Sequence, residues 1–195
     1  MKYADIDYNE CDEVYPPAED TFLLIDNLSI DATDDVLEIG TGSGLVSIFA
    51  SLQCNTVTST DINPHAIECA RNNVELNNRT NIRIIESDLF ENVTEKYDLI
   101  LFNTPYLPVS MEEHSDDNYS KAWDGGESGR EVIDRFIDEA PIYLKKNGRI
   151  QIVQSSLSDN EKTLSEFEKK GFEVEITAIE HVFFEDITLI TAHKR

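Results

Sequence analysis

The stretch Val36-Leu37-Glu38-Ile39-Gly40-Thr41-Gly42-Ser43-Gly44-Leu45 decides the fold of this chain. Its first four residues are mostly apolar and indicate a short buried strand, and three glycines then permit a tight turn in the backbone. The apolar residues of 45–50 that follow are typical of a helix lying on a sheet. A strand, a glycine loop and a helix in this order predict the first unit of a parallel α/β sheet, with a ligand bound at the loop.

Short apolar runs alternate with helical patterns on both sides of this stretch, which is the layout of successive βαβ units. Prolines 16 and 17 precede a helix at 18–25, Asn63 and Pro64 begin a second, and a third runs from Ile133 until Asn147-Gly148. Ser158 and Glu161 form a capping box for a fourth. The predicted strands are 36–39, 56–60, 82–85, 97–102, 149–154, 172–179 and 184–191, with a long loop at 112–129. The prediction is a doubly wound, Rossmann-like α/β sheet of seven strands, mostly parallel, with a C-terminal antiparallel hairpin.

Composition limits the classes of protein that remain. The 195 residues, 40% of them hydrophobic, suffice for one domain spanning 1–195 with a core of its own. No apolar run is long enough to cross a bilayer and the acidic N-terminus is unlike a signal peptide, so we expect a cytoplasmic protein with no membrane partner. Thirty-nine acidic against sixteen basic residues give a net charge of -23, which repels phosphate backbones and disfavours nucleic acid. The same excess also fits adaptation to salt, or solubility alone.

Cysteine and histidine show no metal-ligand spacing. Cys11, Cys54 and Cys69 lack the C-x-x-C pattern of zinc sites and redox motifs, and we expect them to be free thiols. The four histidines have no ligand spacing either. No metal site is expected.

The pattern Glu38-x-Gly40-x-Gly42-x-Gly44 distinguishes between two nucleotide cofactors. A dinucleotide fingerprint requires a further glycine where this chain has Leu45. A carboxylate such as that of Glu38 is awkward beside a pyrophosphate but suits the cationic amino-acid end of S-adenosylmethionine. The loop therefore favours S-adenosylmethionine.

Acidic residues also end the next two strands. Asp61 has the position and chemistry to accept hydrogen bonds from both ribose hydroxyls. Asp88 is placed to accept from the adenine amino group, and Leu89 to cover the base. Ordinary turn or capping aspartates are the alternative at both positions.

Asn103-Thr104-Pro105-Tyr106 follows the fourth strand and so lies at the same edge of the sheet as the glycine loop. The Asn103 side-chain oxygen and the Thr104 carbonyl can each accept one N–H of a planar amide or amine, and so orient its nitrogen and stabilise the charge that develops there. Tyr106 offers a flat face for stacking, and Pro105 stiffens the turn. This motif predicts N-methylation of a planar nitrogen.

Together these stretches resemble the archaeal and eukaryotic branch of the HemK-type methyltransferases, which methylate the glutamine amide in the Gly-Gly-Gln motif of translation release factors. The matching segments are 14–24, 37–44, 60–64, 87–89, 103–106, 123–126 and 129–131. The resemblance implies that Asn103 holds the target amide, and that the cofactor contacts are Thr21, Glu38, Gly40, Asp61, Asp88 and Leu89. Thr104 departs from the family, which usually has proline there, and this leaves the choice of substrate open.

The resemblance also implies a partner. Bacterial relatives recognise the release factor with an N-terminal helical domain, whereas this sequence starts almost directly with the catalytic motifs. In the archaeal and eukaryotic relatives a small zinc-binding activator subunit pairs with a sheet edge, and we expect such a heterodimer.

Three alternatives remain open at this stage. Related eukaryotic proteins are associated with lysine methylation, and adenine N6 of DNA or RNA presents the same planar donor pair to Asn103. A non-catalytic, cofactor-binding subunit is the third alternative, and the intact Glu38, Asp61 and Asn103 argue against it.

Overall fold

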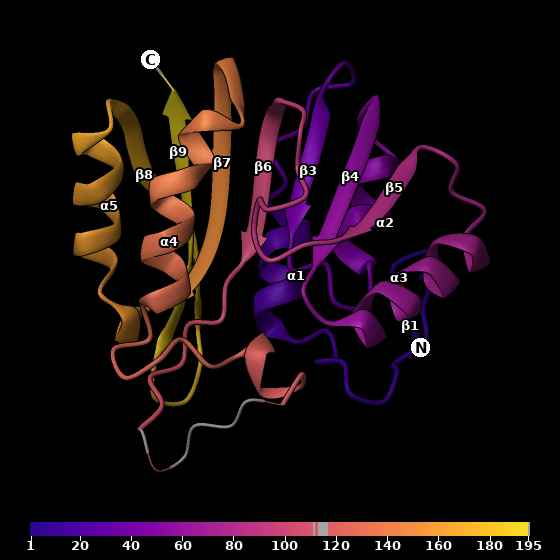
Figure 1. The fold of residues 1–195 in the computed structure, drawn as a ribbon, viewed down its shortest axis with the longest axis horizontal. Coiled ribbons are helices and arrows are strands. Elements are labelled where there is room, and N and C mark those ends of the chain that lie inside the picture. Colours follow the sequence, from indigo (N-terminus) through magenta and orange to yellow (C-terminus); the bar gives the residue numbers. More distant parts are fainter. Residues whose placement is uncertain (111, 113–116, 195) are drawn as a thin grey trace.

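The computed structural model of the protein describes residues 1–110, 112 and 117–194, so part of the loop expected at 112–129 lies outside the described residues. The described chain forms a seven-stranded sheet in the order β5-β4-β3-β6-β7-β9-β8 (Figure 1). Its strands are β3 (Asp35–Ile39), β4 (Thr56–Asp61), β5 (Ile82–Glu86), β6 (Tyr97–Asn103), β7 (Leu144–Ser155), β8 (Phe172–His181) and β9 (Asp186–Lys194). The strands β5, β4, β3, β6 and β7 are parallel to one another, and β9 is antiparallel to both β7 and β8. This arrangement confirms the predicted fold class.

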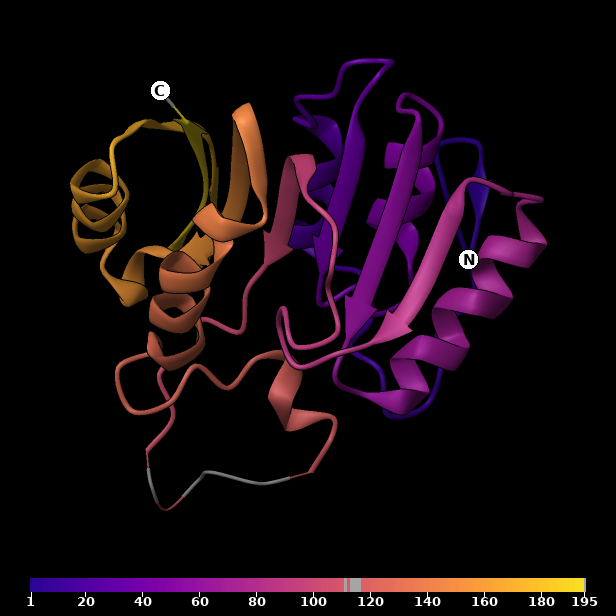
Figure 2. The ribbon, with the colours of Figure 1, turned by 45° about the horizontal axis from the view of Figure 1, so that its top comes forward.

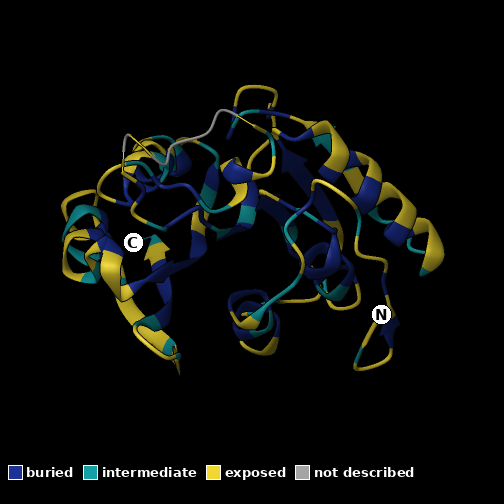
Figure 3. Ribbon diagram, turned by 90° about the horizontal axis from the view of Figure 1, so that it is seen from below, coloured by how far each residue is buried: buried dark blue, intermediate teal, exposed yellow. Residues whose placement is uncertain are grey.

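Helices cover both faces of this sheet, and its central strands are buried between them (Figure 3), whereas the edge strand β8 is largely exposed. The helices are α1 (Glu19–Asp26), α2 (Leu45–Ser51), α3 (Pro64–Leu76), α4 (Glu131–Glu139) and α5 (Asn160–Lys169), with the 3-10 turns η1 (Ser120–Ala122), η2 (Ala140–Ile142) and η3 (Ser156–Ser158). A separate small hairpin of β1 (Lys2–Tyr3) and β2 (Ile6–Asp7) precedes α1. Figure 2 shows β5 at one end of the sheet with α3 alongside it.

The chain order creates a switch point in the middle of the sheet. From β3 the chain moves outward to β4 and β5, then returns to β6 on the other side of β3. Ile39 at the end of β3 is paired with Phe102 of β6, so the segments that follow these two strands diverge from one point. Ligands of open α/β sheets bind in the crevice at such a point.

The central strands are apolar because both of their faces are covered. Val36 and Leu37 of β3, and Leu99 to Leu101 of β6, are fully buried. Glu38 interrupts the apolar run of β3, although it is also almost completely buried. A charged side chain in that position requires compensation, and it marks the site.

Two sequence predictions about helix ends were wrong. The helix predicted to reach Asn147-Gly148 ends at Glu139, and β7 already begins at Leu144, which pairs with Tyr97 of β6. The N-cap of α5 is Asp159, whose side chain accepts from the Lys162 amide, whereas the Ser158 hydroxyl bonds the carbonyl of Tyr106. In both cases a long-range contact overrides the local pattern. Among the described residues, no helix has the length and apolar character needed to span a membrane.

Candidate active site

A cavity of about 330 Å³ opens at the carboxyl ends of the strands on both sides of the switch point. Nine of the residues predicted for the site line it: Thr21, Glu38, Gly40, Gly42, Asp61, Asp88, Leu89, Asn103 and Pro105. Gly44, Thr104 and Tyr106 are not part of this lining. The structure therefore brings most of the predicted residues around one cavity.

The glycines of the loop have different roles. Gly42 has a φ of +53°, which strains any side chain, but a Cβ there would meet no protein atom within 4 Å, so the space beside it is open to a ligand. Gly44 has a φ of +81°, and its Cβ would come within 3.0 Å of the Cα of Ala70 on α3. Gly44 thus serves the close packing of the loop against α3 and does not line the cavity.

Glu38 lies at the bottom of the cavity with only 3% of its surface exposed. Its Oε2 accepts hydrogen bonds from the hydroxyls of Thr41, over 2.7 Å, and Ser47. Burial raises the pKa of this carboxyl to about 8, against the opposing effect of the two hydroxyl donors. A cationic group entering the cavity would stabilise the ionised form.

Asp61 at the end of β4 is held by two backbone amides. Its Oδ2 accepts from Gly42 N over 2.8 Å, and its Oδ1 accepts from Asn63 N over 2.9 Å. Burial raises the pKa of Asp61, and these backbone donors oppose the rise. Each carboxylate oxygen keeps a free lone pair, so a pair of ligand hydroxyls is the complementary partner.

Asp88 has a partner that the sequence did not reveal. Arg135 of α4 donates from Nη2 to both carboxylate oxygens of Asp88, over 3.2 and 3.1 Å. Arg135 and Glu131, one helical turn apart on α4, both line the cavity. Glu131 belongs to the matching segment 129–131, whereas Arg135 is part of no motif and only the folded structure shows its position.

Asn103 ends β6 and lines the cavity. Its Oδ1 is buried and has no hydrogen-bond partner within the described part of the chain. The amide and the hydroxyl of Thr104 point toward β7, since both donate to the carbonyl of Val153, over 3.2 and 2.8 Å. Leaving a buried amide oxygen unpaired costs about 1–3 kcal/mol, and a ligand N–H would remove that cost.

Tyr106 connects the Asn103 segment to the start of α1. The Tyr106 hydroxyl donates to Oδ2 of Asp20 over 3.2 Å, and Oδ1 of Asp20 accepts from the amide of Thr21 over 2.7 Å. Burial raises the pKa of Tyr106, and the nearby Asp20 carboxylate adds to the rise. The ring is 9% exposed, so the structure supports a positioning role for Tyr106 more directly than stacking on a ligand.

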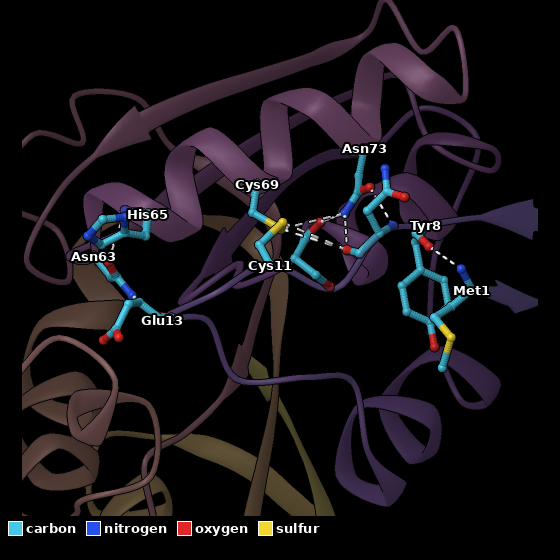
Figure 4. Close-up of a disulfide and its surroundings, with 10 residues drawn as sticks. Met1, Tyr8, Cys11, Glu13, Asn63, His65, Cys69 and Asn73 are labelled. Atoms are coloured by element: carbon cyan, nitrogen blue, oxygen red, sulfur yellow. Dashed lines mark hydrogen bonds between the residues drawn. A yellow bond between two sulfur atoms is a disulfide. The ribbon is translucent and has the colours of Figure 1, made fainter.

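A segment before α1 is attached to α3 by a disulfide and by hydrogen bonds (Figure 4), and it also lines the cavity. Asn73 of α3 accepts from Asn9 N over 2.8 Å, and its Nδ2 donates to the carbonyls of Asn9 and Ser43. Asn63 Nδ2 donates to the carbonyl of Glu13 over 2.7 Å. We call residues 9–17 the N-terminal strap; its members Val14, Tyr15 and Pro17 line the cavity.

The strap also contains a disulfide, contrary to the prediction of free thiols. Cys11 and Cys69 are joined, with their Cα atoms 6.0 Å apart and a sequence separation of 58, and only Cys54 is free. The prediction failed because short-range spacing carries no information about a pair that the fold brings together. Within the described ranges no cluster of His, Cys, Asp or Glu has the arrangement of a metal site.

The loop before α4 forms another part of the cavity wall. Asn118, Lys121, Ala122, Asp124 and Gly126 line the cavity. Arg130, 4% exposed, anchors this loop by donating to the carbonyls of Ser158 and Asp159 and to the hydroxyl of Thr163. The Trp123 to Arg130 segment thus combines cavity-lining residues with a buried structural anchor.

The switch-point cavity, the buried carboxylates and the unpaired amide oxygen define a methyltransferase of the α/β type. A family model, that of the methyltransferase small domain, matches residues 18–118. A Methanocaldococcus jannaschii protein named "Putative protein N5-glutamine methyltransferase" is 51% identical over 92% of this chain and 91% of its own length. Human methyltransferase HEMK2 is 36% identical over 83% of this chain and 80% of its own length.

A solved structure agrees with these relatives. A chain of the E. cuniculi Mtq2–Trm112 complex, described as responsible for methylation of the eRF1 translation termination factor, has a TM-score of 0.76. It is 27% identical, and the match covers 94% of this chain and 99% of that one. The chain belongs to the methyltransferase small-domain family, in the group that includes HEMK2 and the protein N5-glutamine methyltransferases.

Proposed function

We propose that this methyltransferase acts on the side-chain amide of glutamine in the Gly-Gly-Gln motif of a translation release factor, in the cytoplasm. The observation that carries the proposal is the buried, unpaired Oδ1 of Asn103 in the cavity. A primary amide presents two N–H donors in one plane, and one of them would satisfy this oxygen. The names of the relatives support the same substrate.

The cavity has the donor and acceptor set that S-adenosylmethionine requires. The Glu38 carboxylate suits the ammonium end, Asp61 suits the ribose hydroxyls, and Asp88 with Leu89 suits the base. Thr21, Gly40 and Gly42 complete the contacts on the side of α1 and the loop. When bound, S-adenosylmethionine supplies an electrophilic methyl group on a sulfonium.

The residues of this chain then have three tasks in the proposed reaction. Asn103 and the carbonyl of Thr104 hold the amide nitrogen in line and stabilise the positive charge that develops on it. Pro105 stiffens the segment, and Tyr106 fixes its position through Asp20. The cavity walls formed by the strap and the 118–126 loop keep water from the nitrogen.

We also propose that a small zinc-binding activator subunit pairs with the free edge of β5. The E. cuniculi relative is found in a complex with Trm112. The sheet ends in β5 on one side and β8 on the other, and β8 has an irregular register at Ile176/Ala178 and exposed acidic side chains. The edge of β5 is regular and carries partly buried isoleucines, which suits the addition of a strand.

The test is methyl transfer from labelled S-adenosylmethionine, with and without the activator, to a release factor, to its Gln-substituted variant, and to adenine-containing DNA and RNA. We expect label on the Gly-Gly-Gln glutamine only, and loss of this label with Asn103→Ala. Label on adenine or on lysine would replace the proposed substrate. Cofactor binding without transfer to any acceptor would indicate a non-catalytic subunit.

A further inference from the structure

The turn between β8 and β9 lies at the same edge of the sheet as the cavity. His181 of β8 is paired with Asp186 of β9, and Ile187 is paired with Ser155 at the end of β7. Residues 182–185, which we call the hairpin turn, therefore project beyond the carboxyl ends of β6 and β7. Figure 1 shows this turn at the same end of the sheet as the loop that follows β6.

Two hydrogen bonds connect the hairpin turn to the Asn103 segment through η3. The amide of Asp186 donates to the Ser156 hydroxyl over 3.0 Å. Two residues further on, the Ser158 hydroxyl donates to the carbonyl of Tyr106 over 2.5 Å. Because η3 is so short, the turn is held at a fixed position beside the site.

Glu185 in this turn has an unused acceptor. Its Oε2 is buried without a hydrogen-bond partner, and in the described part of the chain this property is shared only with Asn103 Oδ1 among side-chain nitrogen and oxygen atoms. Burial is the main cause of the raised pKa of Tyr15 and of Tyr106, and the charge of Glu185 adds to both, in agreement with the place of the turn beside the Tyr106 segment. Asn103 and Tyr15 line the cavity and Glu185 does not, so the second unpaired oxygen lies outside the cavity, in the hairpin turn.

Phe183 and Phe184 at the tip of the turn are almost completely exposed, at 96% and 92%. Their ring centroids are 5.9 Å apart. The turn itself is ordered by its own contacts, since Val182 packs against the core and its amide donates to the Glu185 carbonyl over 3.1 Å. Exposed aromatic pairs on a fixed turn are typical of protein interfaces.

The charges around the turn indicate what kind of segment it binds. The pKa of Tyr15 is raised mainly by burial, and the carboxylates of Asp20, Glu19 and Glu185 add to the rise. Asp20 also accepts from the Tyr106 hydroxyl over 3.2 Å. His181 is hydrogen-bonded to Asp186, and Lys121 to Asn118. The region near Glu185 is therefore acidic, and a basic side chain is the complementary donor for it.

We propose that the hairpin turn binds the segment of the protein substrate next to the methylated residue, with Glu185 accepting from a lysine or arginine of that segment and Phe183 and Phe184 packing on its apolar side chains. This inference rests on the proposed protein substrate. It assigns Glu185 a positioning role, distinct from that of Asn103 at the reacting nitrogen.

The first experiment measures steady-state methylation of a release factor by Glu185→Gln, and by Phe183→Ser combined with Phe184→Ser. We expect KM for the factor to rise about tenfold in each, with kcat and the cofactor Kd within about twofold of the unchanged protein. Matched controls are Glu175→Gln, an exposed acid elsewhere on β8, and Ile142→Ser, an exposed apolar residue outside the turn. An unchanged KM in the Glu185 variant, or a loss confined to kcat, overturns the proposal.

The second experiment does not depend on catalysis. Two fluorescent peptides, with Gly-Gly-Gln flanked by arginines or by glutamates, are titrated into the cofactor-loaded protein. We expect the arginine peptide to bind at least about tenfold more tightly, Glu185→Gln to reduce this preference, and Glu185→Lys to reverse it. If no factor is methylated, the proposed function fails, whereas equal binding of both peptides refutes the role of Glu185 in either case.

Discussion

The amide of Gly42 donates to Oδ2 of Asp61 over 2.8 Å, and this bond joins the glycine loop after β3 to the end of β4. The two strands are neighbours in the sheet, so their ends form one rigid unit. The carboxylate is therefore oriented by the backbone before a ligand arrives. A residue that both shapes the loop and contacts the ligand has a larger effect on binding than either role alone would give.

Asp61→Ala is expected to weaken S-adenosylmethionine binding by about 100-fold, because it removes an acceptor for two ligand hydroxyls. Asp61→Asn keeps one acceptor oxygen and should lose less affinity. Isothermal titration calorimetry measures both, and thermal unfolding detects any loss of loop structure. Equal affinity for the alanine variant and the unchanged protein would remove Asp61 from the cofactor site.

Asn103→Ala is expected to lower kcat by about 10²–10³, the usual effect of removing one polar group that stabilises transition-state charge. Cofactor affinity should change by less than about threefold, because the unpaired Oδ1 is assigned to the acceptor substrate. Single-turnover methyl transfer at saturating cofactor separates the two effects. An alanine variant with full kcat would refute the role of Asn103.

Glu38 gives the protein a defined pH dependence. Its pKa is raised by burial to about 8, so the folded, cofactor-free protein binds more protons than the unfolded chain at pH values between the ordinary carboxyl pKa and 8. The contribution of Glu38 to the free energy of unfolding therefore falls as pH rises through this range. Cofactor affinity should rise over the same range because the ligand ammonium favours the ionised carboxylate.

Calorimetry in buffers with different ionisation enthalpies measures the protons released when the cofactor binds. We expect release of about one proton near pH 6.5. Glu38→Gln serves as the control, in which both the proton release and the fall in stability should disappear. Binding that is independent of pH in the unchanged protein would contradict the proposed pairing of Glu38 with a cation.

The strand-end residues could be predicted from the sequence because each depends on a local pattern. A buried strand followed by a glycine turn fixes where Glu38 lies, and the same reasoning places Asp61 and Asn103 at one edge. Arg135 and Asn73 could not be predicted, because their roles come from the packing of α4 and α3 against distant loops. The polar side chains of a helix carry no signal of which loop they will meet.

The predictions of helix ends and of free cysteines failed for the same physical reason. Leu144 is apolar at helical spacing, but its pairing with Tyr97 makes it the first residue of β7. Ser158 has the sequence context of an N-cap, but its hydroxyl is used by the Tyr106 carbonyl. Only the tertiary contact decides between such competing partners.

Alanine substitutions at Gly42 and Gly44 test which of the two glycines contacts the ligand and which serves the packing of the loop. Gly44→Ala is expected to destabilise the protein by more than about 2 kcal/mol, because its Cβ meets Ala70 and its φ is positive. Gly42→Ala has room in the protein and should cost only about 1 kcal/mol, yet weaken cofactor binding, because it lines the cavity. Chemical denaturation and cofactor titration of the two variants give the comparison. The reverse pattern would assign Gly44 to the ligand.

The last prediction concerns the Cys11–Cys69 disulfide, which closes a loop of 58 residues. Closing a loop of this length stabilises a fold by about 4 kcal/mol in the chain-entropy model, so Cys11→Ser or reduction should lower the free energy of unfolding by up to that amount. Cofactor binding should weaken as well, because Val14, Tyr15 and Pro17 of the strap line the cavity. Asn9 and Glu13 keep their hydrogen bonds to Asn73 and Asn63, so the loss of affinity should be partial.

Cys54→Ser is the matched control, since Cys54 is free, and it should change neither the free energy of unfolding nor the cofactor affinity. Denaturant unfolding and cofactor titration, each with and without reductant, measure both effects, and equal stability in the two conditions would show that the strap is held without the disulfide.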